Sequence, residues 1–326
     1  MRKFILAVLG LIGITLCYFT LVSAGKVFRS DWQLPGAGYS EGEQQQRLVL
    51  ITQELETPFW DKVGQGALRQ AEEEGVSLEV WGSYGMNQEE FLKRIEIAID
   101  SKVDGIIVQG LDSDNFKSLT KIKAAFYGIP VITVANDVPM SESLRRTYVG
   151  SDSYLAGQLI AVQLVADMGE AGDVILLGDT IQEYYQKQRL AGLQDVLQRY
   201  PDIRMAYAET GATREQVIAT TKDLMNGVPD VDAFIAVNAN MAEAMLYEIG
   251  RRSQIEPYHI YTFDDGKDSE ALFAQGKLDG MLEQSPDRMG ELSVQLMMEW
   301  LRGETVPLDM NGYLTDIRMV KAKDAP

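Results

Sequence analysis

The chain is organised as a regular alternation of short apolar runs and longer segments with helical periodicity, beginning at Arg47. This alternation is typical of parallel β-sheets whose connecting helices cover both faces. Thr57 and Pro58 add the N-cap and the first helical position of one such helix. In the first half we expect strands at 48–52, 78–81, 105–108 and 131–134, and helices at about 58–74, 88–101 and 114–127.

A second series of the same kind follows Asp152. Strands are expected at 173–177, 203–208, 233–237, 259–263 and 278–282, and helices at 154–168, 182–200, 213–226, 241–252, 268–275 and 286–301. One sheet holding all these strands would exceed the size at which single cores usually stop growing. The pattern therefore predicts an α/β fold with two doubly wound parallel sheets.

The N-terminal segment predicts export. Arg2 and Lys3 precede the uncharged run from Phe4 to Ala24, which as a helix would be long enough to cross a bilayer. A cleaved signal stays open as the alternative, because small residues end the run. The run exceeds the usual signal core of roughly 7–15 residues, which favours an anchor. Residues 1–24 are thus interpreted as a membrane anchor or signal segment, 25–46 as a polar tether, and the remainder as extracytoplasmic.

Charge and residue usage exclude several classes of protein. The 30 basic and 48 acidic side chains give a net charge of -18, which disfavours binding to nucleic acid. Cys17 and His259 are the single residues of their types, so we expect neither a zinc cluster nor a Cys–His catalytic pair. The common nucleotide, metalloprotease and serine hydrolase motifs are also absent. We expect no enzyme, cofactor or metal; the alternative is an extracytoplasmic α/β enzyme acting on a small polar substrate.

Polar and aromatic side chains gather where the expected strands end. In open α/β sheets ligands bind beyond the carboxyl ends of the strands. Four such groups follow strands: Thr57-Pro58-Phe59-Trp60, Ala135-Asn136-Asp137, Asn238-Ala239-Asn240 and Phe263-Asp264-Asp265. Aromatic rings suit the C–H faces of a sugar, and Asp, Asn and Arg can bond its hydroxyls. The sequence therefore predicts a small polyhydroxylated ligand, with plain packing as the alternative role for Phe59 and Trp60.

From Leu48 to Met319 the chain resembles the type I periplasmic binding proteins, in the ribose-binding-like branch related to the lactose-repressor effector domain. Six motifs carry the resemblance in order: Thr57-Pro58-Phe59-Trp60, Ile129-Pro130-Val131-Ile132-Thr133, Tyr148-Val149-Gly150-Ser151-Asp152 with Ala156-Gly157, Gln188-Arg189-Leu190-Ala191-Gly192, Ala236-Val237-Asn238-Ala239-Asn240-Met241-Ala242, and Phe263-Asp264-Asp265 with Glu283-Gln284-Ser285-Pro286-Asp287-Arg288-Met289-Gly290. The chain departs from the branch at Ala135, where sugar binders commonly carry an acidic residue, and at Thr57, where Asn is frequent.

The resemblance implies two lobes that close on a sugar-like ligand. The lobes would be 47–151 with 285–310 and 152–284 with 311–322, joined by a three-segment hinge near Ser151, Gln284 and Asn311. The implied ligand-binding residues are Thr57, Phe59, Trp60, Asn136, Asp137, Arg189, Asn238, Phe263, Asp264 and Gln284. Within this set Phe59 and Trp60 would sandwich the ligand, with Phe263 as the opposite wall.

Arg189 has the most specific role in that set, because a guanidinium can fork two ligand oxygens. The alternative is an exposed charge on a long helix. Removing a cleft-facing Arg189 is expected to weaken binding by about 2–4 kcal/mol and to change the stability of the unliganded fold by less than about 1 kcal/mol.

The expected function is that of an exported solute-binding protein, tethered to the membrane by its N-terminal helix. It would either deliver a carbohydrate to an ABC permease or present the closed form to a membrane histidine kinase of a two-component system. A fixed tether favours the kinase, because it keeps the protein at high effective concentration beside its partner. A repressor role is excluded, because the uncharged run stands where a helix-turn-helix would precede the domain.

Overall fold

The structure is a computed structural model, and it describes Tyr18 and the residues 45–84, 87–180, 183–211, 213–252, 258–263 and 267–321. The side chains of 239–240 and 267–270 lie outside this description. The expected membrane run apart from Tyr18, most of the tether, and Asp264 also fall outside the described residues. Gln45–Pro326 forms one compact unit, which is described by itself.

The first sheet is entirely parallel. Its strands run in the order β11 (Tyr313–Leu314), β5 (Thr147–Gly150), β4 (Val131–Val134), β3 (Gly105–Gln109), β1 (Arg47–Thr52) and β2 (Ser77–Gly82). Along β1, Leu48 and Leu50 belong to one apolar cluster and Val49 and Ile51 to another, so both faces of the sheet are covered. The helices of this first lobe are α2 (Pro58–Glu74), α3 (Gln88–Asp100), α4 (Asp114–Ser118), the π-helical η1 (Leu119–Ala124), α5 (Met140–Ser143) and α11 (Pro286–Arg302).

The second sheet repeats this plan with one antiparallel edge. Its order is β12 (Arg318–Lys321), β10 (Gly280–Glu283), β9 (His259–Phe263), β8 (Ala233–Ala236), β6 (Ala171–Asp179) and β7 (Asp202–Thr210), and β12 runs against β10. The helices of this second lobe are α6 (Ser153–Met168), α7 (Tyr184–Leu197), α8 (Arg214–Gly227), α9 (Ala239–Arg252) and α10 (Lys267–Ala274). The predicted α/β fold with two doubly wound, mainly parallel sheets is confirmed.

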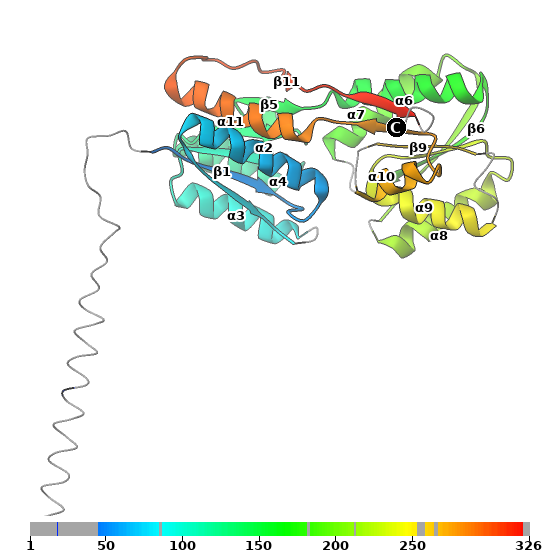
Figure 1. The fold of residues 1–326 in the computed structure, drawn as a ribbon, viewed down its shortest axis with the longest axis horizontal. Helices are drawn as coiled ribbons and strands as arrows, with labels where there is room; N and C mark the ends of the chain where they lie inside the picture. The colour runs from blue at the N-terminus through cyan, green and yellow to red at the C-terminus, as the bar shows by residue number, and fades with distance from the viewer. Residues whose placement is uncertain are drawn as a thin grey trace, which may run out of the picture. The chain divides into compact units, whose positions relative to one another are not determined.

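A close helix pair built on glycine occurs in each lobe. In the first lobe α11 lies along α2, although the two are far apart in sequence (Figure 1). A Cβ atom on Gly66 would lie 2.0 Å from the carbonyl oxygen of Asp287, and one on Gly290 2.0 Å from that of Val63. Only glycine lets the two backbones approach this closely. The pair therefore fixes α11, and with it the chain that enters from the second lobe.

The pair α6 and α7 in the second lobe has the same construction. A Cβ atom on Gly157 would lie 2.1 Å from the carbonyl oxygen of Arg189, and one on Gly192 2.0 Å from that of Tyr154. Because the contact runs through the main chain of Arg189 itself, the packing of α6 sets the position of this side chain.

The chain passes between the two sheets in three short segments: after β5, after β10 and after β11. These crossings are bonded to one another. The Ser151 hydroxyl donates to Gln284 Oε1 at 2.6 Å, the Thr315 amide donates to the Gly150 carbonyl at 2.8 Å, and the Ser285 hydroxyl donates to the Asp316 carbonyl at 3.0 Å. The sequence placed the third crossing near Asn311, whereas Tyr313 and Leu314 still pair with β5 of the first sheet, so the last segment leaves that sheet only after Leu314.

Candidate ligand-binding site

Each sheet reverses its strand order at one point. In the first sheet β1 lies between β2 and β3, and in the second β6 lies between β7 and β8. Ligands of open α/β sheets bind beyond the carboxyl ends of strands at such points. The groups after β1, β4, β8 and β9 that the sequence singled out all follow carboxyl ends in these sheets.

Thr57 caps the helix that carries the aromatic residues Phe59 and Trp60. Its hydroxyl accepts a hydrogen bond from the Trp60 amide at 3.4 Å and so caps α2 directly beyond β1. Trp60 is 4% exposed and packs in the core of the first lobe. Phe59 is half-buried and meets Trp60 edge to face, with ring centroids 5.5 Å apart. Of the two rings, Phe59 is the one with surface left for a ligand.

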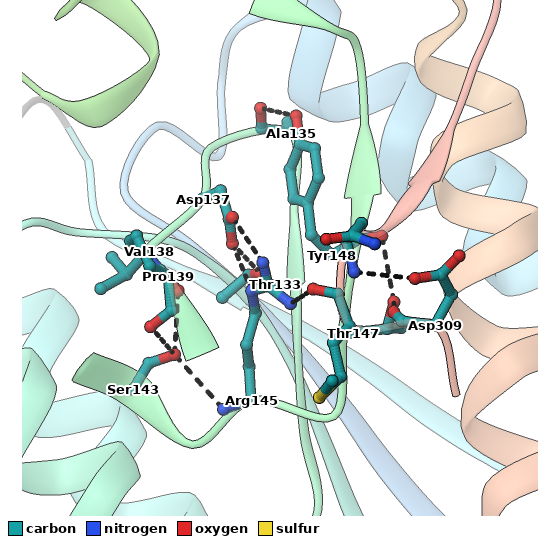
Figure 2. A network of polar contacts seen from close by, with 12 residues as sticks. Thr133, Ala135, Asp137, Val138, Pro139, Ser143, Arg145, Thr147, Tyr148 and Asp309 are labelled. Carbon is teal, nitrogen blue, oxygen red and sulfur yellow. Dashed lines mark hydrogen bonds and ion pairs between the residues drawn. The ribbon is translucent and has the colours of Figure 1, made fainter. Parts of the chain in front are cut away.

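Asp137 is engaged within the protein. Its carboxylate accepts from Arg145 Nε at 2.6 Å and from Arg145 Nη2 at 2.7 Å, and Thr133 donates its hydroxyl to the same carboxylate at 2.7 Å (Figure 2). The Asp137 side chain is 12% exposed and that of Arg145 is 4% exposed. Both carboxylate oxygens are used in this bidentate pair, so the carboxylate has a structural task that the sequence did not indicate.

The side chain of Asn136, unlike that of Asp137, is not engaged by a neighbouring side chain of the described part of the protein. It is half-buried, and its side-chain amide makes no hydrogen bond to another described residue. Its main chain is fixed, because its amide donates to the Val134 carbonyl at 2.7 Å and its carbonyl accepts from the Gly110 amide at 2.9 Å. The turn thus presents an amide side chain on a fixed backbone at the end of β4.

Arg189 is a buried cation between two aromatic rings. Its side chain is 4% exposed, and its guanidinium carbon lies 4.9 Å from the centroid of Tyr185 and 4.6 Å from that of Phe263. Nη1 donates to the Val237 carbonyl at 2.8 Å, just beyond β8. The alternative of an exposed helix charge is therefore wrong. Desolvated stacking of this kind fixes the plane of the guanidinium.

The other second-lobe residues lie around Arg189. Asn238 is half-buried and uses Oδ1 to accept from the Met241 amide at 3.2 Å, which caps α9 and leaves its amide nitrogen for another acceptor. Phe263 is fully buried in the second core and reaches the site as the ring beneath Arg189. Asp264, next in the chain, is outside the described residues.

Gln284 lies at the second crossing rather than on a sheet face. It is half-buried and accepts the Ser151 hydroxyl described above. Its hydrogen bond with Ser151 joins the second crossing to the first. The resemblance implied a ligand contact beside a hinge for this residue.

Two contacts at the strand ends were not predicted. Gln109, buried at the end of β3, accepts from the Thr52 hydroxyl at 2.9 Å and the Gln53 amide at 2.8 Å, and so links β3 to β1 at the point of reversal. Across the lobes, the Asp112 amide donates to Glu183 at 3.1 Å. Burial raises the pKa of the Glu183 carboxyl. The strand-end argument could have found Gln109, whereas nothing in the sequence marks Glu183.

The described residues were compared with what a metal site and a membrane-spanning helix require. Among these residues no group of His, Cys, Asp and Glu side chains is arranged to hold a metal ion. No helix in the same part of the chain combines the length and hydropathy that a membrane crossing needs.

Two doubly wound lobes with polar and aromatic side chains at their strand ends define a class of two-lobed ligand-binding proteins. Residues 48–305 match the family described as periplasmic binding protein domain, and the chain belongs to this family. It is 24% identical over 274 residues to the ribose import binding protein RbsB of Escherichia coli (strain K12), which covers 84% of this chain and 90% of that protein.

Solved structures agree in fold. The structure of GanP, a glucose-galactose binding protein from Geobacillus stearothermophilus, is 29% identical and superposes with a TM-score of 0.81 over 87% of this chain and 100% of that one. The XylFII-LytSN complex has a TM-score of 0.75 at 24% identity, over 87% of this chain and 100% of that one, and shows the fold alone. The family is one of extracytoplasmic binding proteins, so the enzyme alternative is set aside.

Proposed function

We propose that the protein is an extracytoplasmic carbohydrate-binding protein whose lobes close on a monosaccharide. The observation that carries the proposal is Arg189, a buried guanidinium stacked between Tyr185 and Phe263 at the carboxyl ends of the second sheet. A planar donor held on aromatic rings suits adjacent hydroxyls, and ring faces suit the apolar face of a sugar. The relatives support the same ligand class: RbsB is a ribose import binding protein, and GanP is a glucose-galactose binding protein.

The contacts refine the proposed set of ligand-binding residues. We keep Thr57, Phe59, Asn136, Arg189, Asn238, Asp264 and Gln284, and we leave Asp137, Trp60 and Phe263 as supports, the last because its ring is fully buried beneath Arg189. Asp137 is held by Arg145, and Trp60 is packed in the first core. With Ala135 in the place of an acidic residue, the first lobe offers an amide rather than a carboxylate to the sugar. An uncharged acceptor gives weaker hydrogen bonds than a carboxylate, so more of the affinity falls on the second lobe.

Closure would occur by rotation about the three crossings. Lobe boundaries at 47–151 with 285–310 and 152–284 remain part of the proposal, and the pairing of β11 with β5 supports moving the third crossing to 315–317. The short cross-bonded segments suit a hinge, because small dihedral changes there rotate each lobe as a body. The hydrogen bond from the Asp112 amide to Glu183, which already joins the lobes in this structure, would then break when the lobes open.

The expected result of a sugar panel tests the ligand class. We expect one or more of D-ribose, D-xylose, D-glucose and D-galactose to raise the melting temperature of the full chain in detergent micelles. A sugar at about 100 times its dissociation constant adds about 2.7 kcal/mol to the free energy of unfolding. Arg189→Ala serves as the control that should lose the shift. No shift with any of these sugars, nor with their polyols, would contradict the proposal.

For the partner, we propose a membrane anchor at Phe4–Ala24 and a tether at 25–46. Such a fixed tether favours presentation to a membrane histidine kinase over delivery to an ABC permease, as the effective concentration beside the partner is raised. N-terminal sequencing of the protein extracted from membranes decides the first step. A mature protein that starts at Gly25 would refute the anchor and restore the permease as the expected partner.

A further inference from the structure

The turn at the end of β4 has an unusual backbone. Ala135 has φ 62, in the left-handed region that L-residues other than glycine seldom adopt. The hydrogen bond from the Asn136 amide to the Val134 carbonyl encloses Ala135 and makes this a γ-turn of the rare, strained form. A strained turn persists where neighbouring contacts hold it. The question is therefore which contacts hold Ala135.

Tyr148 supplies one of them. It lies on β5 and is 7% exposed. Its hydroxyl oxygen is 3.0 Å from the carbonyl oxygen of Ala135 (Figure 2) and 3.0 Å from that of Ser151. One hydroxyl proton is thus shared between the turn and the first crossing. Two glycines make room for the ring: a Cβ atom on Gly150 would lie 2.2 Å from the Tyr148 hydroxyl, and one on Gly312 2.9 Å from its Cδ1.

From Ser151 the contacts continue to the second crossing. The Ser151 hydroxyl donates to Gln284 Oε1 at 2.6 Å. The path from Ala135 to Gln284 therefore uses three hydrogen-bond contacts: two made by the Tyr148 hydroxyl, to the carbonyls of Ala135 and Ser151, and one made by the Ser151 hydroxyl to Gln284.

The other side of the turn is tied to the chain just before β11. Arg145, which holds Asp137, also donates from Nη1 to the Met310 carbonyl at 3.0 Å. The Thr147 hydroxyl donates to the neighbouring Asp309 carbonyl at 2.7 Å. Figure 2 shows these contacts converging on the same part of β5 and the chain before β11. The turn is thus tied on one side to the first crossing and on the other to the chain that leads into β11.

We propose that Tyr148 is a positioning residue that couples the turn carrying Asn136 to the crossings at Ser151 and Gln284. Tyr148 contacts no ligand itself. It holds Ala135 in the left-handed conformation and so aims Asn136, and the same hydroxyl restrains the segment that moves on closure. A sugar that engages Asn136 thereby favours one setting of the hinge. This inference rests on the proposed function, because it assigns a role at the same site.

Hydrogen exchange of the unliganded full chain in detergent micelles tests the coupling without any ligand. Tyr148→Phe keeps the ring and removes the hydroxyl. We expect exchange of the amides at Ala135, Asn136 and Thr315 to accelerate by about three- to tenfold. The control is Tyr261→Phe, a buried tyrosine of β9 whose hydroxyl donates to Asp167 at 2.7 Å and which should leave these amides unchanged. Equal protection in Tyr148→Phe and wild type would overturn the coupling.

Calorimetry with D-ribose, D-xylose, D-glucose and D-galactose gives the second readout. We expect Tyr148→Phe to raise the dissociation constant of the bound sugar by about three- to tenfold, and Tyr261→Phe to leave it within about twofold. If Tyr148→Phe melts lower but binds like the wild type, the hydroxyl only stabilises the fold and the proposal is wrong. If wild type binds none of these sugars, the proposed ligand class fails, while the exchange experiment still decides the coupling.

A second variant covers the case in which Tyr148→Phe does not fold. Ser151→Ala removes the hydroxyl that bonds Gln284 and leaves the Tyr148 contacts in place. We expect it to weaken sugar binding by about three- to tenfold while the turn at Ala135 stays protected from exchange. Unchanged affinity in Ser151→Ala would overturn the step from the first crossing to the second.

Discussion

Replacement of Arg189 by alanine should affect both the fold and the binding of ligand. In the unliganded protein the guanidinium donates to the Val237 carbonyl at 2.8 Å and stacks between Tyr185 and Phe263. Arg189→Ala removes the donor and both ring contacts, and it empties the space filled by a side chain that is only 4% exposed. The sequence alone predicted a cleft-facing side chain without such contacts.

The magnitude follows from these contacts. A hydrogen bond from a charged donor contributes about 1.5–3 kcal/mol, and desolvated cation–π contacts contribute up to about 2 kcal/mol. The cost of burying the guanidinium offsets part of this gain. We expect the free energy of unfolding to fall by about 2–4 kcal/mol, which corresponds to a melting temperature lower by about 4–12 °C. The expectation of less than about 1 kcal/mol is thereby revised upward.

Two assays separate the roles. Differential scanning calorimetry of the unliganded chain measures the loss of stability, and titration calorimetry with the sugar identified by the panel measures affinity, which should fall roughly 30- to 1000-fold. Arg189→Lys should restore only part of either quantity, because an ammonium lacks the planar fork. The matched control is Arg199→Ala, just beyond the same helix, where the side chain is 64% exposed and pairs with Asp195. Its loss should stay below about 0.5 kcal/mol.

Two results would refute the reasoning. An unliganded melting temperature within about 1 °C of wild type would show that the stacked arrangement contributes nothing to the fold. Sugar affinity within about threefold of wild type would show that Arg189 does not contact the ligand.

Three further changes test the supports of the site. Gly192→Ala places a methyl group 2.0 Å from the Tyr154 carbonyl; urea unfolding should show a loss of about 3 kcal/mol, and an unchanged midpoint would contradict the close approach. Asp137→Ala leaves the Arg145 guanidinium buried without its carboxylate, so thermal unfolding should show a loss of about 3–5 kcal/mol, and a loss below about 1 kcal/mol would mean that the pair is solvated. Burial raises the pKa of Glu183, so the folded protein binds this proton at higher pH than the unfolded chain does. The melting temperature of wild type, measured relative to that of Glu183→Gln, should therefore rise as the pH falls from about 7 to about 5. The opposite trend would contradict this assignment.

The sequence predicted most of the architecture because the apolar alternation is long and regular. It missed β5, β11 and β12, which have two to four residues each and too little pattern to separate strand from loop. The expected helix at 114–127 contains the π-helical η1. Thr120 lies within η1, and its buried hydroxyl donates to the Phe116 carbonyl at 3.0 Å, which competes with the regular helical bond.

The site was predictable to the extent that strand ends mark it. Those ends located the turn at Asn136 and the residues around Arg189, but they could not separate a ligand-facing carboxylate from a paired one. Arg145 is eight residues from Asp137 and lies on the far side of α5, so no sequence spacing reveals the pair. Likewise the sequence does not show whether Phe59 or Trp60 packs into the core, because both residues are aromatic and adjacent.

The glycine contacts of the helix pairs limit how this sequence can vary. At Gly66, Gly157, Gly192 and Gly290 the atom in the way of any side chain is a main-chain carbonyl oxygen of the facing helix. A substitution on the opposite helix cannot remove that oxygen, so a larger residue at one of these four positions has no compensating change elsewhere. Surface positions of the same helices have no such restriction. In proteins that evolve from this sequence we therefore expect these four glycines, two in each lobe, to be kept, while other positions of the helices and the ligand preference change.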